Sequence, residues 1–245
     1  MQPMRKFTAG VQLFDDIRER GLIYVDKTDL IYQLTQESMF VFINRPRGVG
    51  KSLLCSTIKC YFEGRKELFE GLAMEKLETE WKKYPVLYFD LLECEKATNA
   101  TEIYATLNEQ LSVYENIYGI DEIGGTPGRR FANILSHAFK MTGKKCVVII
   151  DNYDSPWINV IDNVQECTFR KRIMMEFYIV VKAYEKYEHF VFITGITEFS
   201  TESTFSGLNN LTDISSLPQY STICGTTVDK TFSKEEKNIT DWIVE

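Results

Sequence analysis

The chain has 245 residues, of which 44% are hydrophobic and 26% are charged, and its formal net charge is −7. This composition is typical of a globular protein with a substantial core, so a disordered or fibrous chain is excluded. Proteins that bind nucleic acid through their whole surface are usually basic, so the charge gives no support to a DNA partner, which stays open only through a local patch. The basic runs at 129–130 and 170–172 are expected to be solvated helix faces.

The cysteine and hydropathy patterns exclude further classes of protein. The six cysteines form no C-x-x-C pair and there are two histidines, whereas a closed zinc site needs four clustered ligands. Buried, reduced thiols are expected, as in cytoplasmic proteins. The N-terminus lacks the apolar core of a signal peptide, and no run approaches the ~20 apolar residues of a membrane span. The sequence therefore predicts a cytoplasmic protein with no membrane partner.

Apolar runs rich in β-branched and aromatic residues alternate with segments of helical periodicity. Before the first run, a short helix is expected from Asp29 to Leu34 with Thr28 as its N-cap. The apolar runs predict buried strands at 39–43, 86–90, 146–151 and 190–194. The periodic segments predict helices at 51–62, 101–118, 131–141 and 169–187, with loops at 119–128 and from 207 onward. Strands buried on both faces and separated by helices are typical of a parallel α/β sheet.

The loop after the first strand has the features of a phosphate-binding site. A strand, a loop with Gly48 and Gly50, the triplet Gly-Lys-Ser and a helix form the context that a Walker A motif requires. Backbone N–H groups at the helix N-terminus favour anions, and the glycines allow close approach of the backbone. Lys51 can reach the β- and γ-phosphates, and the Ser52 hydroxyl can ligate Mg²⁺. The expected nucleotide-binding residues are Arg45, Pro46, Arg47, Gly48, Val49, Gly50, Lys51, Ser52 and Leu53.

The motif departs from the usual pattern at its first position. The pattern G-x-x-x-x-G-K-[ST] has glycine where this chain has Arg45. An ordinary strand-to-helix turn with a lysine at the helix start is therefore the alternative interpretation.

A second candidate site lies at the end of the strand at 146–151. The strand ends at Asp151, and α/β proteins bind ligands at the carboxyl ends of parallel strands. Asp151 is expected to hold Mg²⁺ together with Ser52, through a water molecule on the aspartate side. The alternative is a strand-terminal aspartate that only caps a turn.

Three further residues are candidates for catalysis. Many ATPases carry a glutamate directly after this aspartate, and its carboxylate polarises the attacking water. Here the residue is Asn152, whose amide cannot accept a proton at neutral pH, so binding should persist without fast hydrolysis. Asp154 is a substitute only if the turn directs it inward. Thr194, which ends the strand at 190–194, is a candidate contact to the γ-phosphate or the attacking water.

Four ordered blocks of residues extend over most of the chain. They are Phe14-x-x-Ile17-Arg18 with Tyr24-Val25-Asp26-Lys27-Thr28; Arg45-Pro46-Arg47 with Gly50-Lys51-Ser52-Leu53-Leu54, Tyr61-Phe62-Glu63-Gly64 and Leu68-Phe69-x-Gly71-Leu72; Ile150-Asp151-x-Tyr153-Asp154-x-Pro156; and Phe205-Ser206-Gly207-Leu208-Asn209-Asn210-Leu211-Thr212-Asp213-Ile214-Ser215. In these blocks the chain resembles the AAA-ATPase-like family of bacterial P-loop proteins.

The resemblance implies a P-loop NTPase fold, a three-layer α/β sandwich with a mainly parallel sheet, and the binding of ATP with Mg²⁺. It accounts for Arg45, because the family's loop normally begins Arg-Pro-Arg. The chain departs from the family at Asn152, where the family has glutamate, and at Gly48-Val49, where it has Arg-Phe. Family members usually continue into a restriction-endonuclease-like domain, of which no counterpart is expected here.

The expected organisation has three parts. Residues 1–37 form an N-terminal segment packed on the core, residues 38–227 form the AAA-like P-loop domain, and residues 228–245 form a short helical segment that links to a missing domain. Tyr24 to Thr28 is expected near the adenine. Arg45 and Arg47 either add charge to the phosphate site or face a neighbouring subunit.

The leading hypothesis is an ATP- and Mg²⁺-binding domain that acts as a nucleotide-gated regulatory module, with slow hydrolysis left open. One alternative, favoured by Asn152, is a non-hydrolysing scaffold that binds protein or DNA. Another is a phosphotransferase, for which the sequence offers no acceptor site. A protein partner or self-association is compatible with each of these hypotheses.

Overall fold

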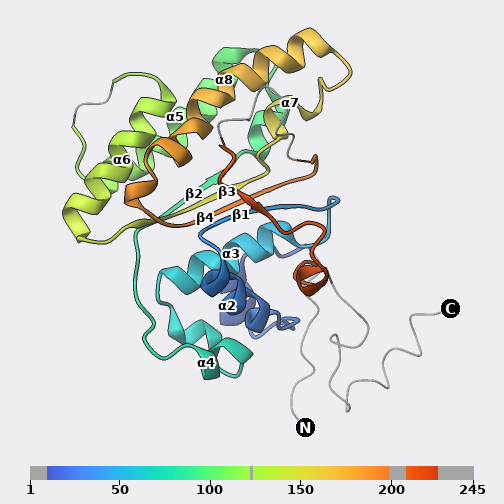
Figure 1. Ribbon diagram of the computed structural model, residues 1–245, viewed down its shortest axis with the longest axis vertical. Helices are drawn as coiled ribbons and strands as arrows, with labels where there is room; N and C mark the ends of the chain where they lie inside the picture. The colour runs from blue at the N-terminus through green and yellow to red at the C-terminus, as the bar shows by residue number, and fades with distance from the viewer. Residues whose placement is uncertain (1–9, 122–123, 199–207, 226–245) are drawn as a thin grey trace, which may run out of the picture.

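The computed structural model describes residues 10–121, 124–198 and 208–225 as a five-stranded sheet with helices on both faces (Figure 1). The strands are β1 (Phe40–Asn44), β2 (Val86–Asp90), β3 (Cys146–Asp151), β4 (Glu188–Gly195) and β5 (Thr212–Asp213). The α-helices are α1 (Phe14–Glu19), α2 (Thr28–Glu37), α3 (Lys51–Phe62), α4 (Ala73–Leu77), α5 (Ala100–Ile117), α6 (Pro127–Thr142), α7 (Ser155–Ile158) and α8 (Val164–Ala183). Short 3-10 helices are η1 (Lys66–Phe69), η2 (Leu92–Lys96), η3 (Glu185–Tyr187) and η5 (Pro218–Tyr220). The helix expected within 228–245 lies outside the described residues.

The sheet has the strand order β2-β3-β4-β1-β5, and each neighbouring pair is parallel. All residues of β3 are buried, which is why this strand consists of an unbroken apolar run up to its final aspartate. The expected bounds of β2 and β3 are confirmed; β1 begins and ends one residue later than expected, and β4 extends further at both ends. The two-residue strand β5 lies within a segment that was expected to be loop, and it pairs with β1 at the edge of the sheet.

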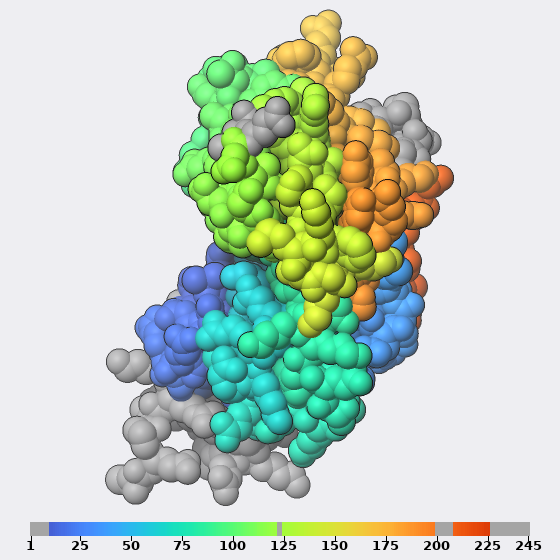
Figure 2. Space-filling model, turned by 90° about the vertical axis from the view of Figure 1, so that its left-hand side faces the viewer, coloured from blue at the N-terminus to red at the C-terminus, as the bar shows by residue number. Residues whose placement is uncertain are grey.

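The helices form two layers, one on each face of the sheet. Alternate residues of a buried strand point to opposite faces, so Val148 and Ile150 pack with α5, α6 and α8, whereas Val147 and Ile149 pack with α1 to α4. Figure 1 shows these two layers above and below the sheet. In Figure 2 the blue and cyan residues of the second layer occupy the lower part of the described molecule, and the green and yellow residues the upper part. The expected three-layer α/β architecture is confirmed.

Several helix boundaries differ from the expected ones because capping decides where these helices start. Helix α6 begins at Pro127 rather than at Phe131, since the Thr126 side chain accepts a hydrogen bond from the Arg129 N–H and proline is favoured in the first turn. Helix α8 runs from Val164 to Ala183 rather than from 169 to 187, because Asn163 caps it. Both starts had recognisable sequence signals.

The N-terminus of α2 corrects another expectation. Thr28 is the first helical residue, not the N-cap. The carboxylate of Asp26 accepts hydrogen bonds from both the N–H and the hydroxyl of Thr28, at 2.9 and 2.7 Å. Its second oxygen accepts from the Ala73 N–H at 2.7 Å, so the turn before α2 is tied to α4.

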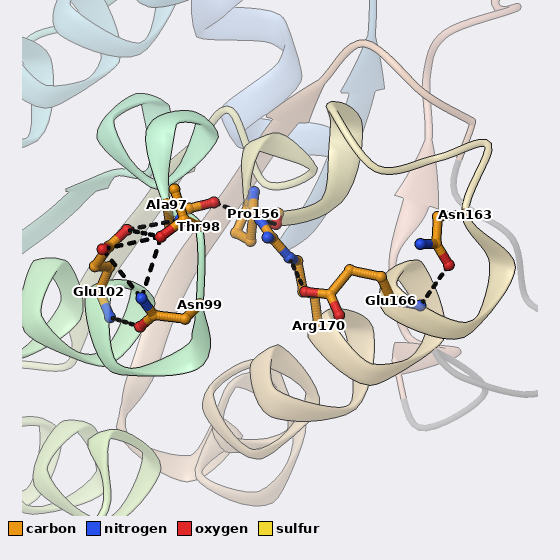
Figure 3. A network of polar contacts seen from close by, with 8 residues as sticks. All are labelled: Ala97, Thr98, Asn99, Glu102, Pro156, Asn163, Glu166 and Arg170. Carbon is orange, nitrogen blue, oxygen red and sulfur yellow. Dashed lines mark hydrogen bonds and ion pairs between the residues drawn. The ribbon is translucent and has the colours of Figure 1, made fainter.

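Two arginines of the basic runs are buried rather than solvated, so that expectation is wrong at these positions. Arg130 on α6 makes a bidentate ion pair with Glu115 of α5, with N–O distances of 2.7 and 2.6 Å. Arg170 on α8 donates to the Ala97 carbonyl at 2.8 Å, to the Pro156 carbonyl at 3.2 Å, and to Glu166 at 2.8 Å (Figure 3). Each guanidinium thereby joins neighbouring elements on the side of the sheet that carries α5, α6 and α8.

Two further expectations concern the burial of the cysteines and the presence of membrane-spanning helices. Cys224 is half-buried and the other five cysteines are buried. Within the described ranges, no helix combines the length and the apolar character that crossing a bilayer demands.

Glu188, at the start of β4, is a buried carboxyl group without compensation. Neither side-chain oxygen has a hydrogen-bond partner in the described part of the chain. Burial, with a smaller effect of the nearby Glu185 charge, raises its pKa to about 9. The folded protein therefore holds a proton on this group over a pH range in which the unfolded chain, with a pKa near 4.5, releases it.

We predict that Glu188→Gln removes a stability loss that the parent shows as pH rises. The contribution of Glu188 to the free energy of unfolding is fully present below pH ~4.5. It declines as pH rises toward ~9, and at neutral pH the decline is on the order of 3 kcal/mol. Urea unfolding from pH 5 to pH 9 measures the difference between variant and parent. The exposed substitution Glu109→Gln should follow the parent curve. Parallel curves for the parent and Glu188→Gln would show that Glu188 ionises normally.

Candidate functional site

Polar side chains lie at or next to the ends of three neighbouring strands, at the carboxyl edge of the sheet. Asp90 on β2 lies opposite Asp151 on β3, and β3 is paired in turn with β4, which carries Thr194. On the other side of β4, Thr194 lies opposite Ile43 of β1, directly before the loop that leads to α3. The structure therefore brings the expected loop, Asp151 and Thr194 to one place.

The side chain of Lys51 is buried at the start of α3, with 6% of its surface exposed. Its ammonium group donates to the carbonyl oxygens of Arg45 and Pro46, at 2.8 and 2.9 Å. Burial lowers its pKa, and the nearby charges of Asp151 and Asp154 oppose that effect. The loop backbone thus curls around a lysine ammonium that faces the buried acidic groups.

The glycines of the loop give it this curvature. Gly48 and Gly50 have φ angles of 78° and 90°, a left-handed conformation that is costly for other residues. Gly50 is the N-cap residue of α3 and has no side chain that could accept a hydrogen bond from the first N–H groups of the helix. These N–H groups therefore remain directed at the loop. Gly48, Val49, Gly50, Ser52 and Leu53 all line the adjoining cavity.

The two arginines of the loop have different roles. Arg45 donates to the Ser215 carbonyl at 2.6 Å and to the Asn44 carbonyl at 3.0 Å, so it binds the loop to the C-terminal part of the chain. Arg47 is exposed and pairs with Glu95 at 2.9 Å. Arg47 lines the cavity, while Arg45 does not.

Asp151 is fully buried among hydrogen-bond donors from three elements. Thr194 donates to one carboxylate oxygen, and Tyr88 donates to the other at 3.3 Å. Burial raises the pKa of Asp151, while hydrogen bonds from Ser52 and Thr194 lower it in part and the neighbouring charge of Asp90 raises it further. No basic side chain of the described residues forms an ion pair with this carboxylate, so a cation would stabilise its ionised form.

Asn152 follows β3 in a left-handed conformation, with φ 57°. Asparagine adopts this conformation more readily than most residues, which favours an amide here on backbone grounds alone. Its side-chain N–H donates to the Asp90 carboxylate at 2.9 Å, and the residue lines the cavity. Asn152 therefore positions an acidic neighbour.

Asp154 is held within the protein rather than at the cavity wall. It is fully buried, and one carboxylate oxygen accepts from the backbone N–H groups of Ile196 and Thr197, at 2.9 and 2.6 Å. Its other oxygen has no partner among the described residues. Asp154 thus fixes the turn that follows β4.

The site opens into a cavity of about 640 Å³. The loop and the start of α3 form one wall, and Tyr24, Val25 and Lys27 form another. Asn152 and Leu92 lie at the wall beyond the strand ends. Of the segment from Tyr24 to Thr28, expected near the adenine, Tyr24, Val25 and Lys27 therefore face the same space as the loop.

The described residues 208–225, here called the C-terminal strap, cross the loop side of the cavity. Ser215 accepts a hydrogen bond from the Asn44 N–H at 2.9 Å, and Lys27 donates to the Thr222 carbonyl at 2.6 Å. Cys224 lines the cavity, and burial raises the pKa of its thiol to about 11 although Arg45 and Lys51 lower it. The strap is thus tied to both sides of the site.

Sequence reasoning overlooked Asp90, Tyr88 and the strap. Asp90 ends an apolar strand just as Asp151 does, so the same signal was present in the sequence. Tyr88 and Ser215 carried no such signal, because their contacts join residues far apart in the chain.

Comparison with known proteins yields one family and one relative. A family model described as "Predicted AAA-ATPase" matches residues 8–205. A relative from Azotobacter chroococcum mcd 1, described as an uncharacterized protein in the vnfD 5′ region, is 33% identical over 238 residues. The match covers 94% of this chain and 45% of that protein, so the chain spans less than half the relative's length. No solved structure matches.

Gly195, at the end of β4, is required for the packing of this site. A Cβ atom there would overlap the Tyr153 ring and lie 2.9 Å from a carboxylate oxygen of Asp154. We predict that Gly195→Ala lowers the free energy of unfolding by about 1–3 kcal/mol, as other overpacked sites do. Chemical denaturation measures the loss. Gly124→Ala, whose Cβ meets nothing within 4 Å, should stay near the parent, and equal stability of the two variants would contradict the prediction.

Proposed function

Because the chain belongs to the family of predicted AAA-ATPases, we propose that it binds ATP with Mg²⁺ in the cavity beside the β1–α3 loop. The observation that carries this proposal is the buried ammonium group of Lys51, enclosed by the loop carbonyls and adjacent to Asp151. A cation in this position, at a helix N-terminus with free N–H groups, suits a ligand with several negative charges.

The phosphates would lie along the loop. The N–H groups at the start of α3 and the Lys51 ammonium supply positive charge, and the glycines leave room for close contact. The ammonium would exchange its two carbonyl partners for phosphate oxygens, which are stronger acceptors because they are charged. Arg47, exposed at the cavity wall, has the reach to add a further contact after leaving Glu95.

The residues near Asp151 fit a magnesium ion held partly by the nucleotide. Mg²⁺ is bound by few protein oxygens, keeps several waters and takes phosphate oxygens as ligands. The described residues contain no group of three or more His, Cys, Asp or Glu that would enclose a metal by themselves. Ser52 and Asp151 would therefore hold the ion from one side, and the ion would neutralise charge on the phosphates.

The nucleoside would occupy the other end of the cavity. Ile23, Tyr24 and Val25 line it there with mostly apolar groups, and Ile223 closes it from the strap. The total volume of about 640 Å³ is within the range of cavities that hold small ligands. Adenine stacked or packed on these side chains is consistent with the expectation for Tyr24 to Thr28.

The strap is the basis for a regulatory role. Arg45 and Lys27 bind its carbonyl oxygens, and Cys224 and Gly225 lie at the cavity. A nucleotide that draws on the same loop would change these contacts and thereby the position of the strap. We propose that the module signals its nucleotide state through this segment, to a protein partner or a second copy of the chain.

A second candidate function is a nucleotide-binding scaffold that does not hydrolyse ATP. Asn152, in the place where related ATPases carry a glutamate, favours it because an amide accepts no proton. The two functions differ in ATP turnover and agree on nucleotide binding.

We predict that Mg-ATP raises the melting temperature of the parent and not of Lys51→Ala. A ligand at ~100 times its dissociation constant adds about 2.7 kcal/mol to stability. The matched control is Lys59→Ala, on the same helix but half-exposed beside Glu63, which should keep the parent's shift. Differential scanning fluorimetry measures all three proteins. Absence of a shift in the parent would refute the proposed function.

We also predict that Asp151→Asn separates the metal from the nucleotide. The amide oxygen can still accept the Thr194 hydrogen bond, but the variant loses the charge that attracts the ion. In the parent, the shift with ATP should be larger with Mg²⁺ than with EDTA. The variant should show the smaller shift under both conditions. A full Mg²⁺-dependent increment in Asp151→Asn would place the ion elsewhere.

A further inference from the structure

Asp90 is an acidic group at the site that the proposed function has not yet used. It ends β2, the strand beside β3, and lies directly opposite Asp151 in the parallel register. Tyr88 and Asp151, whose side chains meet at 3.3 Å, share the face of the sheet that is covered by α3. Because alternate residues share a face, Asp90 is directed to the same side as Tyr88.

The backbone of Asp90 is fixed by one side chain. The amide of Gln110, on α5, accepts from the Asp90 N–H at 3.0 Å and donates to the Asp90 carbonyl at 2.7 Å. This double contact replaces the ladder hydrogen bonds that an edge strand such as β2 would otherwise leave to solvent. The carboxylate of Asp90 thus projects from a rigid position.

The carboxylate itself is oriented by two residues at the cavity wall. Its Oδ1 atom accepts from the Leu92 N–H and from the Asn152 side chain, both at 2.9 Å. Leu92 and Asn152 both line the cavity. No hydrogen bond or ion pair within the described part of the chain reaches Oδ2 of Asp90. One oxygen is held, and the other, on a half-buried side chain hydrogen-bonded to Leu92 and Asn152 of the cavity wall, remains available as an acceptor.

The other acidic groups near the cavity are engaged. Asp151 accepts from Thr194 and Tyr88, and in the proposed function it faces the metal ion. Asp154 is fully buried: one oxygen accepts from the backbone after β4, and the other, without a partner among the described residues, is enclosed in the protein. Glu95 lines the cavity but pairs with Arg47. Asp90 is the half-buried carboxylate among these that is oriented by residues of the cavity wall and keeps one oxygen that no described residue contacts.

We propose that Asp90 is the catalytic carboxylate that accepts the proton of the attacking water, and that Asn152 is a positioning residue that holds it. This proposal rests on the proposed function, since ATP is the substrate. The water oxygen forms a bond to the γ-phosphorus, and the bond from that phosphorus to the β,γ-bridging oxygen breaks. ADP leaves with the electron pair, phosphate is formed, and the water proton passes to Oδ2 of Asp90 and then to solvent.

This assignment gives Asn152 a function that differs from a lost glutamate. The amide does not need to accept a proton, because it donates one hydrogen bond to the group that does. A glutamate at this position would instead place a second negative charge against Asp90. The pair of Asp90 and Asn152 is therefore internally consistent as a charged acceptor and a neutral donor.

The test is Asp90→Asn, compared with the parent and with Glu93→Gln. The asparagine oxygen can still accept from Leu92 and Asn152, so the variant loses the charge and keeps the shape. Glu93 lies nearby on η2 and is exposed, which makes its neutralisation a matched control. We expect Asp90→Asn to lower kcat for ATP hydrolysis, measured as ADP formed, by about 10²-fold or more, the usual contribution of a general base. The dissociation constant for Mg-ATP should change less than threefold, and Glu93→Gln should behave like the parent.

The outcomes separate this inference from the proposed function. No Mg-ATP binding by the parent would refute both. Binding by the parent with no measurable turnover would overturn the role of Asp90 and leave nucleotide binding intact. Turnover of Asp90→Asn within threefold of the parent, at equal Mg-ATP affinity, would overturn it as well. A fall in kcat with unchanged affinity and an unchanged thermal unfolding curve without nucleotide supports it, because a purely structural role would also lower stability.

Discussion

The carboxyl edge of the sheet depends on how its buried polar groups satisfy one another. Asp90, Asp151 and Thr194 lie at or next to the ends of three adjacent strands. Asp151 and Thr194 are fully buried and Asp90 is half-buried, so bulk solvent cannot satisfy the first two side chains. Thr194 and Tyr88 donate to Asp151, while Asn152 donates to Asp90. Two carboxylates nevertheless remain side by side, which is unfavourable unless positive charge is near. Lys51 supplies part of that charge, and a metal ion with the nucleotide would complete the balance.

The same constraint connects the site to the rest of the fold. The parallel sheet places the β1–α3 loop beside the ends of β4 and β3, so the lysine at the start of α3 approaches acids from distant parts of the sequence. Gly195 must lack a side chain because Tyr153 and Asp154 pack against it. The strap then covers the loop through Ser215 and its hydrogen bonds. A change at the phosphate-binding loop can therefore reach the C-terminal part of the described chain without passing through the core.

The elements that could be predicted were those whose pattern depends on burial alone. Strands β2 and β3 and helix α3 have the expected bounds, because an apolar run or a Gly-Lys-Ser helix start defines each of them. The expected bounds of helix α8 differ from the observed ones because its hydrophobic periodicity is weak and its start is defined by the Asn163 cap. In the candidate site, the Gly-Lys-Ser triplet predicted the loop and strand ends predicted Asp151 and Thr194, and the structure brings these residues together. Asp90 also ends an apolar strand, but its contact with Asn152 and its place beside Asp151 follow from the order of the strands, which the linear sequence does not contain.

The most direct measurement of the central claim is a crystal structure with a non-hydrolysable ATP analogue and Mg²⁺. The account predicts that the Lys51 ammonium leaves the carbonyl oxygens of Arg45 and Pro46 and binds phosphate oxygens. It also predicts a metal ion between the phosphates and the side chains of Ser52 and Asp151. An analogue bound elsewhere, or a Lys51 ammonium that keeps both carbonyl partners while the analogue is bound, would contradict the account.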